Sequence, residues 1–199
     1  MTDGPDLAAL IGSRICHDLI SPIGAIGNGV ELLMMDGSIK GPEMALISES
    51  VAQANARIRF FRIAFGAADQ RDQRVARTDV QSILSDQTRG GRLAVQWTSE
   101  SDLPRVDVKL AFLILLCLEN ALPFGGRITV TQEDDRWFVK AQSERLKREP
   151  ALWAHLSDAS LPADITPARV HFALVPTELR RAARTLSATW TDTQIDLRF

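Results

Sequence analysis

The sequence contains few of the residues that build disulfide frameworks or metal sites. Its 199 residues include two cysteines, Cys16 and Cys117, and three histidines, His17, His155 and His171. Each cysteine lies within an apolar helical pattern, which is typical of a reduced thiol that packs in a protein interior. The histidines show no zinc-ligand spacing with these cysteines. The sequence therefore predicts neither a disulfide-stabilised fold nor a metal centre.

A strong net charge and long hydrophobic runs are also lacking. The formal net charge is −2, which gives no general attraction to nucleic acid or to an anionic membrane. The longest apolar run, residues 110–118, is about half the length that a membrane span needs. The N-terminal residues show no basic segment and apolar run of a signal peptide. We therefore expect a cytoplasmic protein that binds neither membranes nor nucleic acid.

The first third of the sequence instead predicts two helices joined by a turn. Residues 7–35 and 42–65 are compatible with helix, and residues 36–41 are rich in helix breakers. In both helices, apolar or small residues recur at steps of three and four, as in a bundle seam: Ile15, Leu19, Pro22, Ile26, Gly29 and Leu33, then Ile47, Val51, Ala54, Ile58, Phe61 and Phe65. Two helices alone leave apolar surface exposed, so we expect two hairpins to form a dimeric four-helix bundle.

Another side of the first helix gathers small and polar residues around a histidine. At about 100° per residue, this side holds Ser13, Arg14, His17, Ser21, Gly24 and Asn28. The imidazole of His17 is therefore predicted to point to solvent, with room for another protein to approach. Spacing alone does not separate a functional histidine from an ordinary surface one. Arg57 and Arg62, on the second helix, lie on a face typical of a solvated rim.

The second half of the sequence mixes helices and strands. We expect helices at residues 79–88 and 108–122, strands at residues 93–98, 127–132 and 137–141, and a closing hairpin at residues 188–199. One or two further helices are expected within residues 149–186, interrupted at Pro162, Pro167 and Pro176. This order predicts an α+β protein in which the second half is an α/β sandwich, with helices on one face of a sheet.

Two stretches resemble known signalling families. Residues 17–22, HDLISP, are similar to the H-box of sensor histidine kinases, in which an acid follows the histidine and a proline comes five residues after it. Residues 13–33, SRICHDLISPIGAIGNGVELL, with residues 118–130, LENALPFGGRITV, more closely resemble ChpT-type histidine phosphotransferases. These bacterial relay proteins look like kinases but lack kinase activity. The resemblance implies a hairpin domain, residues 1–68, and a degenerate ATPase-like domain, residues 75–199.

The residues that would bind a nucleotide are missing from the second half. Leu116 stands four positions before Asn120, where the kinase pattern has a polar residue on the magnesium side. Residues 142–147, QSERLK, replace an aspartate and closely spaced glycines, and no glycine follows Gly126. Phosphate-binding backbone favours glycine. We therefore expect no ATP and no other cofactor on this chain, and local contacts for Asn120.

The resemblance implies that the phosphoryl group comes from an aspartate of one receiver domain and passes to an aspartate of another. The partners would be receiver domains of a hybrid kinase and of response regulators, with magnesium bound by the receiver. His17 would be the nucleophile and phosphoryl carrier, and Asp18 would orient its imidazole. Arg14 and Ser21 would contact the phosphoryl oxygens.

The expected receiver-binding surface continues along the first helix from the histidine, at Gly24, Asn28 and Leu32. Two other functions stay open at this point. The chain could be a non-catalytic regulator that docks receivers, or a divergent ATP-dependent histidine kinase.

Overall fold

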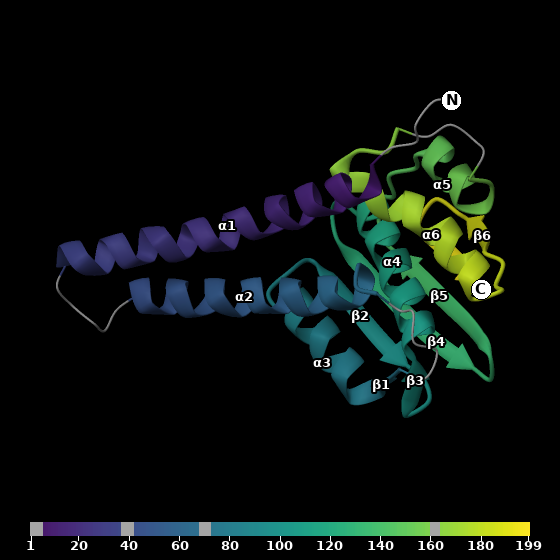
Figure 1. The fold of residues 1–199 in the computed structure, drawn as a ribbon, viewed down its shortest axis with the longest axis horizontal. Coiled ribbons are helices and arrows are strands. Elements are labelled where there is room, and N and C mark those ends of the chain that lie inside the picture. Colours follow the sequence, from purple (N-terminus) through teal and green to yellow (C-terminus); the bar gives the residue numbers. More distant parts are fainter. Residues whose placement is uncertain (1–5, 37–41, 68–72, 160–163) are drawn as a thin grey trace.

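A long helical hairpin projects from an α/β body in the computed structural model (Figure 1). The structure describes residues 6–36, 42–67, 73–159 and 164–199. Helix α1, Leu7–Asp36, and helix α2, Pro42–Ala64, form the hairpin. Both helices agree closely with the predicted ranges; most of the predicted turn lies outside the described residues.

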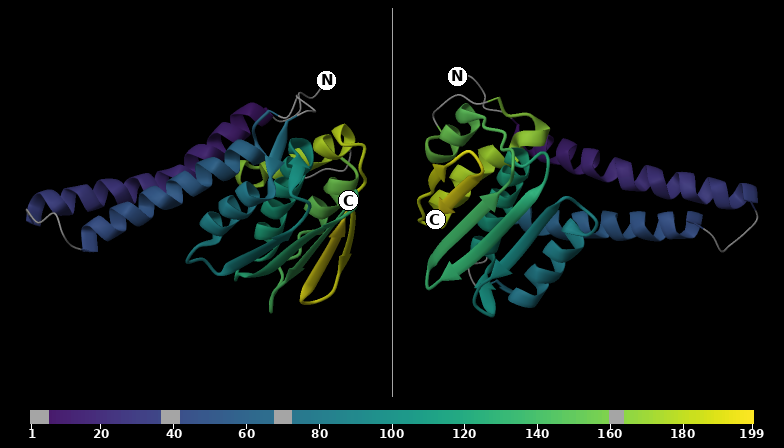
Figure 2. Two further views of the ribbon diagram at one scale, coloured as in Figure 1. Left: turned by 90° about the horizontal axis from the view of Figure 1, so that it is seen from below. Right: turned by 180° about the vertical axis from the view of Figure 1, so that it is seen from behind.

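The body is built around one five-stranded sheet. Its elements are β1 Arg74–Ala76, α3 Arg77–Thr88, β2 Leu93–Thr98, β3 Asp102–Pro104, α4 Arg105–Ala121, β4 Gly126–Glu133, β5 Arg136–Gln142, α5 Pro150–Ser157, the 3-10 turn η1 Pro167–Arg169, α6 Val170–Arg181, β6 Ser187–Trp190 and β7 Gln194–Arg198. The strand order is β2-β4-β5-β7-β6, with β2 parallel to β4 and the other neighbours antiparallel. Helices α4 and α6 cover one face of the sheet (Figure 2). The predicted α+β fold is confirmed.

The structure also contains features that the sequence patterns did not predict. Strands β1 and β3 form a separate antiparallel pair, in which Val75 lies opposite Leu103. Each has only three residues, which is too short to show an alternating pattern. The expected interruption at Pro176 is wrong, because α6 continues through this buried proline. Packing of α6 on α4 outweighs the hydrogen bond that proline cannot donate.

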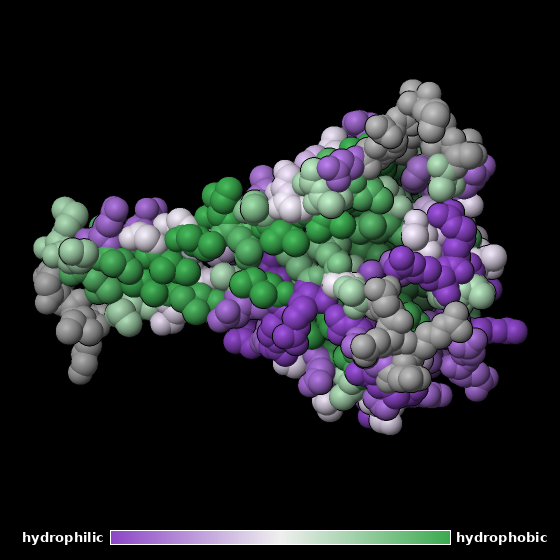
Figure 3. Space-filling view, viewed as in Figure 1, coloured by the Kyte–Doolittle hydropathy of each residue, from purple (hydrophilic) through white to green (hydrophobic). Residues whose placement is uncertain are grey.

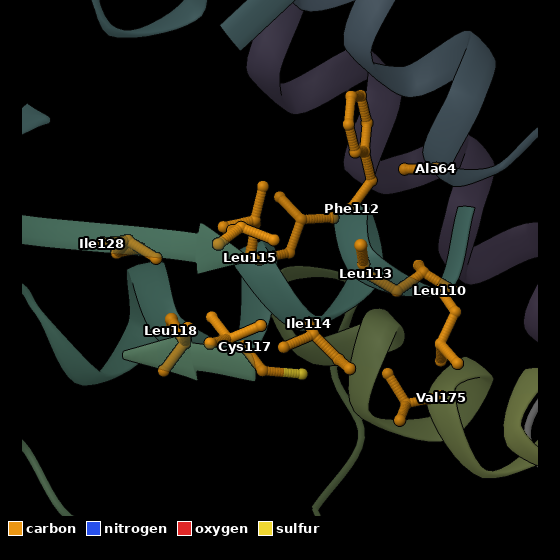
Figure 4. Close-up of a cluster of buried hydrophobic side chains, with 14 of the residues drawn as sticks. Ala64, Leu110, Phe112, Leu113, Ile114, Leu115, Cys117, Leu118, Ile128 and Val175 are labelled. Atoms are coloured by element: carbon orange, nitrogen blue, oxygen red, sulfur yellow. The ribbon is translucent and has the colours of Figure 1, made fainter. Parts of the chain in front are cut away.

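Helix α4 connects the hairpin to the sheet through a shared core. It is buried on nearly all sides, because the sheet, α2 and α6 surround it (Figure 4). Its Phe112 stacks on Phe60 of α2, with ring centroids 4.7 Å apart. In Figure 4, Phe112 points towards Ala64 of α2, while Leu118 lies beside Ile128 of β4. The base of the hairpin is therefore part of the body's hydrophobic core.

Three arginines add polar contacts between hairpin and body. Arg14 of α1 donates to the carbonyl oxygen of Ala168 at 2.9 Å. Arg59 of α2 donates to Asp86 of α3 at 2.9 Å. Arg105 of α4 donates to the carbonyl oxygen of Arg62 at 2.9 Å. These contacts fix the base of α1 and α2 against three different elements of the body.

The predicted seam of α1 is used inside the hairpin. Its members are half-buried, and Gly29 is fully buried against α2. A Cβ atom at Gly29 would lie 2.5 Å from Cγ1 of Ile47, so the close approach of the two helices requires glycine. In α2, Ala54 and Phe61 are buried, whereas Val51 and Ile58 of the same predicted seam are 41% and 49% exposed.

A second apolar stripe of α1 faces solvent. It contains Ile20, Ile23, Val30 and Met34, which follow one another at steps of three, seven and four residues and are between 44% and 80% exposed. Figure 3 shows hydrophobic side chains running along the hairpin from its free end to the body. We call Ile20, Ile23, Val30 and Met34, together with Val51 and Ile58, the outer apolar stripe. Within the described residues, no helix is both long and apolar enough to cross a membrane.

Candidate functional site

His17 stands on an open side of α1, with 86% of its side chain exposed to solvent. Arg14, one turn earlier on α1, donates a hydrogen bond to the carbonyl oxygen of Ala168 in the body, so His17 lies near the base of the hairpin. Successive residues on a helix point about 100° apart. His17 is two residues from both Ile15 and Leu19, so it lies about 160° around the helix from these seam residues. It therefore faces away from α2, which contacts the side of α1 that carries the seam.

Asp18 contacts the imidazole of His17. Its Oδ1 lies 3.2 Å from Nδ1 of His17. A carboxylate only accepts hydrogen bonds, so Nδ1 carries the hydrogen in this contact and the lone pair of a neutral ring is on Nε2. The side chain of Asp18 is 11% exposed, and it joins the exposed imidazole to polar groups at the base of the hairpin.

Arg14 belongs to this half-buried group and not to the open side. Its Nε donates to Oδ2 of Asp18 at 2.9 Å, and another guanidinium nitrogen donates to the carbonyl oxygen of Ala168 at 2.9 Å. Helical angle alone groups Arg14 with His17. The long side chain instead turns towards the body, where a carboxylate and a carbonyl oxygen are available.

The other predicted site residues lie on exposed helix surface. Ser21, Gly24, Asn28 and Leu32 are all exposed, and they follow His17 along α1 at steps of four, three, four and four residues. Ser21 and Asp18 also line a cavity of about 250 Å³ between α1, α2 and the end of α3. The structure thus aligns the four residues on one side of the helix and opens a polar hollow beside them.

Two residues near Asp18 were not singled out as site residues from the sequence. The first is Arg57, whose Nε lies 4.0 Å from Oδ2 of Asp18. The second is Glu119 of α4, within the stretch that carried the family resemblance. Burial raises the pKa of the Glu119 carboxyl, Asp18 adds to this rise, and Arg57 and Arg14 oppose it. The interpretation of Arg57 as part of a solvated rim is wrong.

Asn120 makes the local contacts that the sequence predicted. Its Nδ2 donates to the carbonyl oxygen of Leu116 at 3.2 Å and lies 2.9 Å from Nε2 of His171. His171 is fully buried. Burial lowers the pKa of His171 to about 3, and the charge of Arg14 acts in the same direction. The imidazole is therefore neutral in the folded protein at neutral pH.

This buried histidine predicts a loss of stability in mild acid. In the unfolded chain His171 has a pKa near 6.5, against about 3 in the fold. The neutral ring contributes fully to the free energy of unfolding above pH 6.5. This contribution is lost as the pH falls from 6.5 towards 3, because in that range the unfolded state binds a proton and the folded state does not. From pH 7 to pH 5, His171 should lower the free energy of unfolding by about 2 kcal/mol.

The measurement is denaturant unfolding at both pH values, with the variant His171→Gln as the reference. Glutamine retains a hydrogen-bond acceptor for Asn120 but does not titrate. The wild type should lose about 2 kcal/mol more than the variant between the two pH values. Equal losses would contradict the assignment of a buried neutral imidazole.

Comparison with known proteins identifies the family. The family described as "Histidine phosphotransferase C-terminal domain" matches residues 77–194. The protein phosphotransferase ChpT of Brucella abortus (strain 2308) is 39% identical over 163 residues, which are 80% of this chain and 78% of the relative. A solved bacterial phosphotransferase covers 100% of this chain and 97% of its own, with a TM-score of 0.82 and 33% identity. This chain belongs to the ChpT-type histidine phosphotransferases, the transferases of bacterial phosphorelays.

Proposed function

We propose that His17 carries the phosphoryl group in this relay. The observation that carries the proposal is an exposed imidazole whose Nδ1 contacts Asp18 at 3.2 Å. In the proposed step, the lone pair of Nε2 attacks the phosphorus of a receiver's aspartyl phosphate. The bond from phosphorus to the aspartate oxygen breaks, and that carboxylate leaves with the electron pair. The hydrogen on Nδ1 stays in place, and Asp18 stabilises the positive charge that develops on the ring.

The reverse step passes the phosphoryl group to an aspartate of a second receiver. No proton has to leave Nδ1 in either direction, so the same geometry serves both transfers. Magnesium, held by the receiver, would neutralise the phosphoryl oxygens. Ser21, one turn along α1 from His17, would donate a hydrogen bond to these oxygens. Arg14 is held by Asp18 and Ala168, so we assign it a supporting role.

We also propose that a receiver helix lies along α1 below His17. Gly24 and Asn28 have short side chains, which allow another helix to approach this side of α1 closely. Leu32, which is 48% exposed, adds an apolar surface. A small contact of this kind suits a relay, because fast release requires modest affinity. The receivers would belong to a hybrid kinase and to response regulators, and the exchange would take place in the cytoplasm.

Two copies of the chain are proposed to pair through the outer apolar stripe, which would complete a four-helix bundle. The stripe presents large apolar side chains at bundle spacing, which is typical of a surface that a second copy covers. On α1, Ile23 and Val30 point about 120° or more away from His17, whereas Ile20 lies only about 60° from it, so the dimer and receiver surfaces would be largely separate and would meet at Ile20. In this division, residues 1–68 form the hairpin domain and residues 75–199 the supporting α/β domain.

The chain is expected to transfer phosphate without ATP. The amide of Asn120 is already committed to Leu116 and His171, and residues 169–174, where a glycine-rich phosphate cradle is expected, contain no glycine. Incubation with labelled ATP and magnesium should leave the protein unlabelled. Label on a histidine under these conditions would contradict this proposal and favour a divergent kinase.

A panel of purified, phosphorylated receivers from the same genome tests the proposed relay. At least one receiver should lose its phosphate to this protein within seconds to minutes, and a second should regain it. Receivers that bind the hairpin without any transfer would overturn the proposal in favour of a docking regulator.

A further inference from the structure

Arg57 lies at the centre of a charged group below the exposed histidine. Its Nε is 4.0 Å from Oδ2 of Asp18, the same oxygen that accepts a hydrogen bond from Arg14 at 2.9 Å. The Arg57 side chain is 27% exposed, and its guanidinium lies over the ring of Phe61 at 5.6 Å. One carboxylate oxygen thus faces two arginines, while the other contacts the imidazole of His17.

The same guanidinium also contacts the body. With the Gln87 amide turned so that its oxygen faces Arg57, this oxygen accepts from both terminal guanidinium nitrogens at 2.7 and 3.2 Å. Glu119 of α4 is also near, since Arg57 and Arg14 act on the pKa of its carboxyl. Gln87 belongs to α3 and Glu119 to α4. Arg57 therefore contacts α3 of the body through Gln87, and its charge acts on Glu119 of α4.

This arrangement restricts how Asp18 can move. Adjacent residues on a helix diverge by about 100°, so Asp18 contacts the His17 ring only while its carboxylate is held at a suitable angle. Arg14 fixes Oδ2 from α1 itself. The charge of Arg57 attracts the same oxygen from α2 across 4.0 Å, and the guanidinium is in turn restrained by Phe61 and Gln87. Two arginines from different helices thus favour the orientation of the carboxylate in which Oδ1 faces the imidazole.

We infer that Arg57 is a positioning residue for phosphoryl transfer: it holds Asp18 against Nδ1 of His17, and so leaves Nε2 as the nucleophile. The inference rests on the proposed role of His17. It also gives the α/β body a function in a protein that is not expected to bind ATP. The body supplies the partners that restrain Arg57, and in this way it sets the geometry of a histidine on another part of the chain.

The test compares Arg57→Gln with Arg59→Gln in the full-length protein. Arg59 lies two residues along α2 and pairs with Asp86 and Ser82 of α3, so its variant makes the same charge change away from Asp18. Imidazole ¹⁵N spectra of His17 report the tautomer at a pH where the ring is neutral. Arg57→Gln should shift His17 from the Nδ1–H form to a mixture of tautomers, and Arg59→Gln should leave the spectrum unchanged.

Transfer rates and stability complete the test. Arg57→Gln should slow the initial rate of phosphoryl transfer about tenfold, as is typical when a group that orients a functional histidine is lost. Arg57→Lys keeps a cation near Asp18 and should recover part of this loss. A lower free energy of unfolding with an unchanged tautomer and transfer rate would overturn the inference, since Arg57 would then have a structural role only.

The two hypotheses fail in different ways. If another residue carries the phosphoryl group, His17→Ala will still transfer, whereas the tautomer of His17 will still depend on Arg57. If Arg57 has no positioning role, His17→Ala will abolish transfer and the ¹⁵N spectrum of Arg57→Gln will match that of the wild type.

Discussion

Replacement of His17 by alanine is expected to reduce phosphoryl transfer onto this protein by about a thousandfold or more. Alanine removes the only atom proposed to bond to phosphorus, and the neighbouring groups cannot substitute for it. Asp18 is held by Arg14 and contacts the ring that is lost. The stability of the fold should change little, because the imidazole is 86% exposed and only a surface contact disappears.

Two variants make this result specific. Ser21→Ala changes the same exposed side of α1 and should slow transfer about tenfold at most, since one hydrogen bond to the phosphoryl group is lost. His155→Ala removes a histidine from α5 in the body and should transfer at the wild-type rate. Transfer is measured as loss of phosphate from a labelled receiver. If a labelled receiver lost its phosphate to His17→Ala at the wild-type rate, this result would contradict the relay role of His17.

The outer apolar stripe carries the second large effect. The double variant Ile23→Asp, Val30→Asp places two carboxylates per chain where a second copy is proposed to pack. Burial of one such apolar side chain is worth about 1.5 to 3 kcal/mol, and a buried unpaired charge opposes it further. Across two copies the four substitutions remove about 6 to 12 kcal/mol, which is comparable with the free energy of a micromolar to nanomolar dimer, so the variant should be a monomer in sedimentation equilibrium while the wild type is a dimer.

Leu32→Asp is the matched control for this experiment. Leu32 is an exposed apolar residue of the same helix, 48% exposed against 58% for Ile23, but it lies on the side of His17. This variant should remain a dimer and should bind receivers less tightly. A wild-type protein that sediments as a monomer, or a double variant that stays a dimer, would contradict the proposed bundle.

The hairpin shows what a sequence pattern can predict and what it cannot. Spacing of three and four residues predicted both helices almost to the residue. It did not show which partner each apolar side would meet, because α1 carries two such stripes. The stripe of Ile15 and Leu19 closes the hairpin and contacts the body, whereas that of Ile20 and Ile23 is exposed. Periodicity identifies the apolar sides of a helix, but only the arrangement of the helices in space shows which partner each side contacts.

The alignment of the exposed histidine with its neighbours could be predicted from the sequence. His17, Ser21, Gly24 and Asn28 follow one another on a single helix, so their alignment depends only on helical geometry. The group around Asp18 depends on contacts between residues that are distant in the sequence. Arg57 is 39 positions from Asp18 by residue number, and it comes close only because α2 folds back on α1.

The two cysteines also illustrate this limit. Both lie in apolar helical patterns, yet the structure buries Cys117 in α4 and exposes Cys16 on α1. Burial raises the pKa of the Cys117 thiol well above its usual value, as expected of a packing residue. Cys16 lies one turn before Ile20, which belongs to the outer apolar stripe. It would therefore be buried only if a second copy of the chain covered this stripe.

The central claim is that one imidazole on α1 carries phosphorus between two aspartates. The most direct measurement is to incubate the protein with a phosphorylated receiver and to locate the transferred group by mass spectrometry of peptides kept at alkaline pH. We predict a single acid-labile phosphoramidate on His17, which disappears when an unphosphorylated second receiver is added. A stable phosphate on another side chain, or a protein that stays unmodified while the receiver loses its phosphate, would contradict the account.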